Sequence, residues 1–159
     1  MRGAKLIPIA GIAAALAASA SASAAALPGV VAEIGPPYYG SIQVRPAEIV
    51  WTGDGTGLFA GRRHPTVRPA DSEIDWIAWT RSSATGTAYS WLDNCVPDCA
   101  DGSFTSYPVR LRLGDPGTLN HHRVFLKMTA IYTHRVPAGS KRRSIWTASY
   151  APTGGGYNW

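Results

Sequence analysis

The sequence predicts an all-β protein: a single antiparallel β-sandwich or barrel-like domain that follows a signal peptide. Apolar and polar residues alternate with a period of two in several separate stretches, which is the pattern of a half-buried strand. Clusters of Gly, Pro, Asp and Ser separate these stretches, as turns do. Beyond the first 26 residues, no segment keeps a clear helical period over ten residues. Many short strands joined by such turns are typical of sandwiches and barrels.

The N-terminus has the three parts of a secretory signal peptide. Arg2 and Lys5 supply positive charge, residues 6–18 are apolar, and small Ser and Ala residues continue to Ala26. We expect cleavage near Ala26, so that residues 1–26 are removed and the mature chain is extracellular. The apolar stretch is too short for a membrane span, and no later segment is apolar enough, so we expect no span in the mature chain.

The remaining chain divides by composition into three parts. Residues 27–40 are rich in Pro and Gly and predict an extended, unpacked lead-in. Residues 41–150 hold the alternating stretches and predict the β domain. Residues 151–159 contain three consecutive glycines and predict a Gly-rich tail that is loose up to Gly156, and the sequence leaves open whether its closing Tyr157-Asn158-Trp159 docks or is free. A mature chain of this size is long enough for one domain with a real core.

The charge of the mature chain is mild. The formal net charge is +5, and removal of Arg2 and Lys5 leaves +3. Such a charge is compatible with anionic surfaces, but it does not indicate a nucleic-acid binder, for which we expect a strongly basic domain. The expected partners are a cell-envelope polymer or an extracellular protein. The sequence leaves the oligomeric state open.

The expected strands follow the alternation. They cover 42–51, 74–79, 87–92, 109–113, 124–130 and 144–150. Within the second of these, Trp76 and Trp79 differ by three positions, so a regular strand places them on opposite faces. We expect one of them in the core and Trp79 as the candidate for an exposed aromatic contact. Residues 114–117, Gly-Asp-Pro-Gly, predict a turn.

Cys95 and Cys99 are the only cysteines of the chain. In an oxidising compartment, two cysteines in one short segment are expected to pair. The loop they close is small, so the chain-entropy gain is only about 2 kcal/mol. We therefore expect a local clip on a turn, with no redox role.

Oxygen-bearing side chains surround the two cysteines. They are Asp93, Asn94, Asp98 and Asp101. They are candidates for a calcium site, although their order differs from the known calcium loop. The alternative is a polar turn in which these side chains accept hydrogen bonds from backbone N–H groups. No other cofactor is expected.

Three basic residues are candidates for an anionic-partner surface. Arg110 and Arg112 alternate with Val109, Leu111 and Leu113, so they share the polar face of one strand, and Lys127 lies on the polar face of another. The alternative is ordinary solvated charge that protects solubility and sheet edges.

Several motifs together resemble those of a group of small secreted proteins of actinobacteria. They are Arg45-Pro46 with Ile49, Thr52-Gly53-Asp54-Gly55, Trp79-Thr80, Cys95-Val96-Pro97-Asp98-Cys99-Ala100-Asp101-Gly102 and Pro108-Val109-Arg110-Leu111. The resemblance covers about residues 42–137. It implies a secreted small β domain with a local disulfide, and it implies no activity, ligand or catalytic residue.

The sequence therefore favours a secreted, non-catalytic β domain with an extracellular interaction or cell-envelope role. A small secreted hydrolase is the alternative from another class, and a secreted inhibitor or toxin-like factor is a third. Hydrolase motifs such as G-x-S-x-G and H-E-x-x-H are absent. Glu48, Asp54, Glu73 and Asp75 are available as carboxylates, but nothing in the sequence selects a pair.

Overall fold

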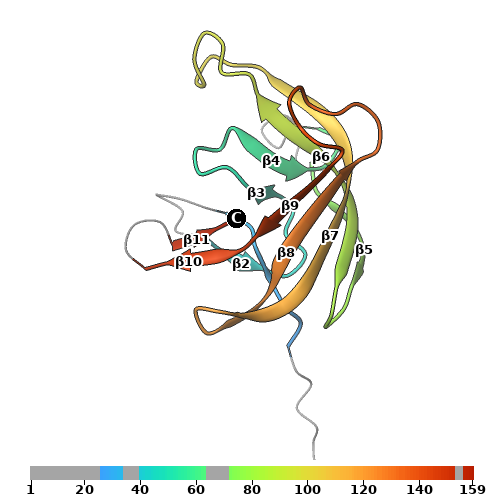
Figure 1. The fold of residues 1–159 in the computed structure, drawn as a ribbon, viewed down its shortest axis with the longest axis vertical. Coiled ribbons are helices and arrows are strands. Elements are labelled where there is room, and N and C mark those ends of the chain that lie inside the picture. Colours follow the sequence, from blue (N-terminus) through green and yellow to red (C-terminus); the bar gives the residue numbers. More distant parts are fainter. Residues whose placement is uncertain (1–25, 34–39, 64–71, 153–155) are drawn as a thin grey trace, which may run out of the picture.

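The computed structural model describes residues 26–33, 40–63, 72–152 and 156–159, and Figure 1 shows their arrangement. Within these ranges the chain forms strands and turns without a helix, which confirms the all-β prediction. The predicted signal peptide lies outside the described residues, except for Ala26.

The main sheet is antiparallel and curls into a half-barrel (Figure 1). Its strands are β3 (Ile49–Val50), β4 (Gly57–Ala60), β5 (Asp75–Trp79), β6 (Ala84–Asp93), β7 (Phe104–Leu119), β8 (His122–Tyr132) and β9 (Arg143–Thr147). The order is β3-β4-β6-β7-β8-β9. One edge of β6 is paired with β7 along the whole length of β6. The other edge of β6 pairs first with β5, at residues 84–87, and then with β4, at residues 89–92.

The core lies on the inner, concave face of this sheet. Leu111 and Leu113 of β7 stand opposite Ala130 and Met128 of β8, and Phe59 of β4 is fully buried with them. On β7 the buried Leu111 and Leu113 alternate with the exposed Arg110 and Arg112, as the period-two pattern of the sequence predicts, whereas β4 is buried at all four positions. Burying several such side chains, at about 1.5–3 kcal/mol each, supplies the driving force for the curl.

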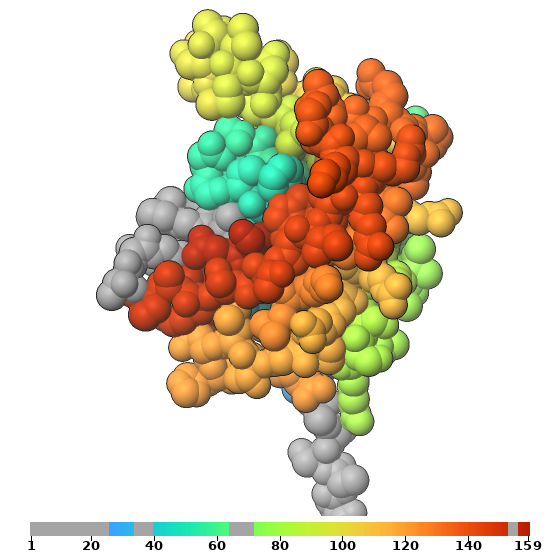
Figure 2. Space-filling view, viewed as in Figure 1, coloured from blue at the N-terminus to red at the C-terminus, as the bar shows by residue number. Residues whose placement is uncertain are grey.

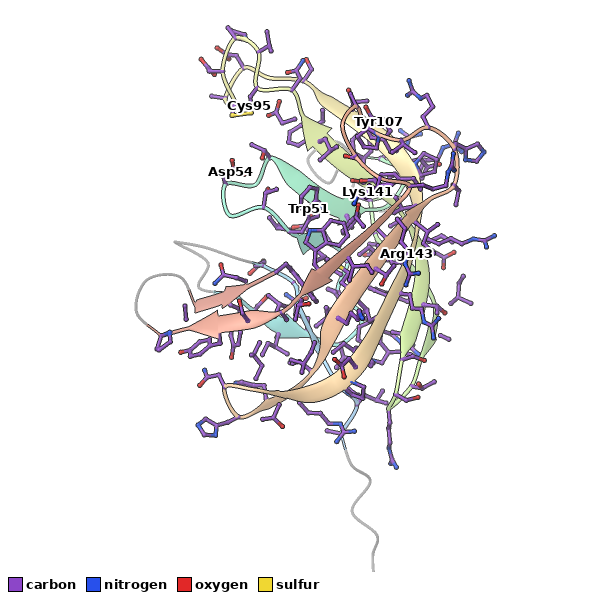
Figure 3. The ribbon with its side chains drawn as sticks, viewed as in Figure 1. Trp51, Asp54, Cys95, Tyr107, Lys141 and Arg143 are labelled. Carbon is purple, nitrogen blue, oxygen red and sulfur yellow. A yellow bond between two sulfur atoms is a disulfide. The ribbon has the colours of Figure 1, made fainter. Side chains whose placement is uncertain are left out.

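Aromatic side chains join the two ends of the half-barrel. Trp51, which follows β3, packs against Trp146 of β9 with ring centroids 5.3 Å apart, and Phe59 meets the same ring edge-on at 5.7 Å. Figure 3 shows Trp51 inside the curl, between the first strands and β9. Contact between side chains, without strand pairing, therefore closes this side of the molecule.

Residues 27–33, the first part of the unpacked lead-in expected for 27–40, are mostly buried, and residues 34–39 lie outside the described residues. β1 (Val30–Val31) pairs with β2 (Ile42–Gln43), and both valines are fully buried. Gly29 forms a bridge to Val124 of β8. The Gly29 N–H donates to the carbonyl of Arg123, and the Gly29 carbonyl accepts from the N–H of Phe125, both at 2.9 Å. Residues 29–31 are extended, lie against the sheet and contribute to the core.

The C-terminal residues described by the structure are also packed, so of the two possibilities left open for residues 157–159 the docked one is observed. β10 (Ser149–Ala151) pairs with β11 (Gly156–Asn158), and Tyr157 is buried. The indole N–H of Trp159 donates to the carbonyl of Val31 at 2.9 Å, which ties the end of the chain to β1.

The turn expected at 114–117 is not formed, because these residues continue β7. Pro116 and Gly117 pair with Phe125 and Val124 of β8. The reversal occurs instead at Asn120 and His121, which both have positive φ, the geometry of a tight hairpin turn. Pairing with β8 outweighs the local turn preference.

Candidate functional site

The loop between β6 and β7 carries the disulfide predicted from the two cysteines. Cys95 and Cys99 are bonded, with an S–S distance of 2.10 Å. The loop projects from the body of the molecule, at the top of Figures 2 and 3. The bond closes only this loop and crosses no layer of the core, so it is a local clip as expected.

The acidic side chains of this loop cap the backbone. Oδ1 of Asp93 accepts from the N–H of Cys95 at 3.0 Å, and Oδ1 of Asn94 accepts from Val96 and Ser103. Oδ1 of Asp98 accepts from Ala100 and from Asp101, at 2.9 and 3.0 Å. These bonds match the alternative interpretation as a polar turn.

The structure does not assemble the calcium site considered for Asp93, Asn94, Asp98 and Asp101. Their Oδ1 atoms, where bonded, point to separate backbone N–H groups of the loop. In the part of the chain that the structure describes, no group of three or more His, Cys, Asp or Glu side chains could hold a metal ion.

The loop before β4 is a second capped turn. Asp54 accepts from the Thr56 hydroxyl at 2.7 Å and from the Thr56 N–H at 3.1 Å. Hydrogen bonds from Thr56 therefore hold the pKa of the Asp54 carboxyl below its usual value. Asp54 lies at the tip of this loop in Figure 3 and stabilises the turn.

Trp79 is buried, so its proposed role as an exposed aromatic contact is wrong. Only 6% of its surface is exposed, and its indole N–H donates to the carbonyl of Pro28 at 2.9 Å. An irregularity in the pairing of β5 with β6, between Trp76 and Ala78, reverses its expected direction. Trp79 packs edge-on against Phe125 in the core.

The three predicted cations lie on the outer face of the sheet. Along β7 and β8, the buried pairs Leu111–Ala130 and Leu113–Met128 alternate with the pairs Arg112–Thr129 and Gly114–Lys127. Arg112 and Lys127 therefore lie on the face opposite the core. Arg110 stands two residues before Arg112, on the same side.

Register adds a fourth cation, Arg143, which lies one residue before the strand expected at 144–150. Arg110 pairs with Ile131 of β8, and Ile131 pairs with Arg143 of β9. Figure 3 labels Arg143 on β9. We call Arg110, Arg112, Lys127 and Arg143 the outer basic face. All four are exposed, and none makes an ion pair with another residue that the structure describes.

Apolar side chains lie between these cations. Ile131 is 40% exposed and Ile145, which pairs with Thr129, is 48% exposed. Large apolar residues on the solvent side of a sheet are typical of a contact surface when they form a group. Ile131 stands between Arg110 and Arg143, whose backbones are therefore about 10 Å apart, while Arg110 and Arg112 are about 7 Å apart along β7.

Beside the outer basic face is a hollow of about 280 Å³. Its charged and polar lining comes from Arg62, Glu73, Asp75, Thr87, Tyr89, Arg110 and Thr133. The structure thus selects, from the four carboxylates available in the sequence, the pair Glu73 and Asp75. Sequence reasoning missed the hollow because its two sides, β5 and β7, meet only through β6.

The lining of the hollow limits its chemistry. No Ser, Cys or His is among the residues that line it, and its hydroxyl groups come from Thr87, Tyr89 and Thr133. Glu73 and Asp75 are both exposed to solvent. A carboxylate pair in bulk-like water is suited to binding cations more than to acid–base catalysis, which depends on a desolvating environment.

Comparisons with known proteins add no family: no family model matches the chain, and neither a curated protein nor a solved structure matches it. Among the described residues, no helix is long and apolar enough to cross a membrane.

Proposed function

We propose that the chain is a secreted, non-catalytic binding domain, and that its outer basic face holds an anionic polymer of the cell envelope. The observation that carries the proposal is the shared face of Arg110, Arg112, Lys127 and Arg143 across three adjacent strands. A group of exposed cations on one face of a sheet is complementary to a chain of negative charges.

Three features support this choice. The cations have no acidic partner among the described residues, so their charge is available to a ligand. The exposed Ile131 and Ile145 add apolar contact between them, which strengthens binding beyond simple charge attraction. The signal sequence expected in residues 1–26 and the disulfide are compatible with a site of action outside the cytoplasm.

The test is sedimentation of residues 27–159 with isolated bacterial cell walls, before and after removal of their anionic polymers. We expect binding to the complete walls, weaker binding as salt is raised, and little binding to the extracted walls, because exposed charges are screened by salt. Equal binding to both preparations would contradict the proposal. Binding to neither would direct the search to a protein partner.

A matched pair of variants locates the contact. Arg112→Gln removes one charge from the outer basic face, and Arg135→Gln removes one charge where the guanidinium lies 5.6 Å from the Tyr107 ring centroid. We expect Arg112→Gln to lower wall affinity by about threefold to fivefold, as for one exposed ionic contact of about 1 kcal/mol. Arg135→Gln should change it less than Arg112→Gln does.

A small secreted hydrolase is the second candidate, because Glu73 and Asp75 line one hollow. The supernatant of the same sedimentation assay distinguishes the two functions. Soluble fragments released by the wild-type chain, and not by Glu73→Gln or Asp75→Asn, would establish catalysis. Retention on the wall without released fragments is the result expected of a binding domain.

A further inference from the structure

The hollow beside the outer basic face has charges of both signs on its lining. Glu73 and Asp75 contribute carboxylates from the β5 side, Arg110 contributes a guanidinium from β7, and Arg62 adds a second one after β4. None of these four makes an ion pair with another residue that the structure describes. A hollow with a negative side and a positive side is complementary to a zwitterion.

The register sets the separation of the two signs. Asp75 pairs with Thr87, and Thr87 pairs with Arg110, so two strand spacings separate the carboxylate from the guanidinium. Two spacings of about 4.8 Å place their backbones about 10 Å apart. A small group with an ammonium and an anion can therefore lie over Thr87, with each charge near its opposite.

The size of the hollow agrees with a small ligand. Its volume of about 280 Å³ is just below the range of about 300–1,000 Å³ that holds drug-sized molecules. The Tyr89 ring and Pro108 provide apolar surface for the short carbon chain between the two charges.

We propose that this hollow binds a zwitterionic unit in which a primary ammonium and a phosphate are joined by a short carbon chain. Asp75 and Glu73 hold the ammonium, and Arg110 with Arg62 holds the phosphate. The inference rests on the proposed function, since it names such aminated phosphate units as the part of the anionic polymer that the hollow recognises. Arg110 belongs to both sites and connects them.

The probe is phosphoethanolamine, titrated into residues 27–159 while backbone amide signals are followed by NMR. Inorganic phosphate and ethanolamine are titrated separately as single-charge controls. We expect shifts at Asp75, Thr87 and Arg110, and an affinity for phosphoethanolamine at least tenfold above that for either control. An affinity no higher than for phosphate alone would overturn the inference, because the carboxylates would then contribute nothing.

Two variants separate the hollow from the outer basic face. Asp75→Asn should lower phosphoethanolamine affinity about fivefold, because it removes one of the two carboxylates that hold the ammonium. Arg112→Gln should lower wall sedimentation and leave phosphoethanolamine affinity within twofold. Glu73→Gln repeats the first test in case Asp75→Asn fails to fold.

The two assays can fail independently. Phosphoethanolamine binding without wall binding would overturn the proposed function and leave the hollow as a zwitterion site. Wall binding with no response of Asp75, Thr87 or Arg110 to phosphoethanolamine would overturn the inference and leave the proposed function standing. An Asp75→Asn variant that binds phosphoethanolamine like the wild type would also overturn the inference.

Discussion

The rings of Trp76 and Trp79 meet edge to face, with centroids 4.7 Å apart and planes at 83°. Residues three positions apart on a regular strand face opposite sides. Here Trp76 pairs with Gly86 and Ala78 pairs with Thr85, so β5 has one residue more than β6 between these pairs. Ile77 is that extra residue and is 68% exposed. The bulge brings both indoles to one face.

The indole N–H of Trp79 is predicted to hold the N-terminal segment against the sheet. In Trp79→Phe the carbonyl of Pro28 loses its donor, which should lower the free energy of unfolding by about 2 kcal/mol. The amides of Gly29 and Val30 should exchange with solvent faster than in the wild type. Urea unfolding and hydrogen exchange measure the two effects. Ile77→Thr, at the exposed bulge position, is the control and should change stability by less than about 0.5 kcal/mol.

Gly86 is predicted to be required by the close approach of β5. A Cβ at this position would lie 2.9 Å from the carbonyl oxygen of Asp75 and 3.0 Å from the Trp76 ring. Gly86→Ala should therefore destabilise the protein by about 1–3 kcal/mol. Gly114→Ala is the matched control, because its Cβ would have no atom within 4 Å. An equal loss of stability in both variants would show that the loss comes from replacing a strand glycine as such, and not from contact of the new Cβ with β5.

Loss of the disulfide is predicted to be tolerated. Replacement of Cys95 and Cys99 by Ala should lower the free energy of unfolding by about 2 kcal/mol, the chain-entropy value for a loop this short. Capping by Asp93 and Asp98 continues to define the turn in the variant. Thermal and urea unfolding measure the loss. An unfolded double variant would show that the clip is essential.

Glu48 is predicted to oppose stability at neutral pH. Burial raises the pKa of its carboxyl above the usual 4.5, and the charge of Glu33 raises it further. The folded protein therefore binds a proton here more tightly than the unfolded chain does. Its stabilising contribution is present below pH 4.5 and is lost as pH rises through the folded pKa. Glu48→Gln should be more stable than the wild type at pH 7, with a difference that shrinks on acidification.

Asp54 should show the opposite dependence. Because hydrogen bonds from Thr56 lower the pKa of Asp54, its contribution is present above the usual 3.8 and is lost as pH falls through the folded pKa. Asp54→Asn should be less stable than the wild type at pH 7 and equal to it in strong acid. Urea unfolding of both variants at several pH values tests the pair. If the difference in unfolding free energy between a variant and the wild type did not change with pH, the pKa direction assigned to that carboxyl would be contradicted.

Local patterns were sufficient for much of the fold and for part of the candidate site. Alternation predicted the strands around Leu111 and Met128, and it placed Arg110, Arg112 and Lys127 on polar faces that the structure brings together. The short spacing of the cysteines predicted their disulfide. Each of these inferences depends on residues close together in the chain, where side-chain direction follows from the backbone period.

Contacts between distant segments decided the rest. The burial of Val30 depends on β8, the packing of Tyr157 depends on β10 and the N-terminal segment, and the direction of Trp79 depends on a bulge against β6. The hollow exists because β6 holds β5 and β7 at its two edges. The sequence by itself determined an all-β chain with a clipped loop and a basic strand, because those follow from local periodicity and spacing. Only the tertiary structure decided which charges meet, because strand register is set by pairing between residues far apart in sequence.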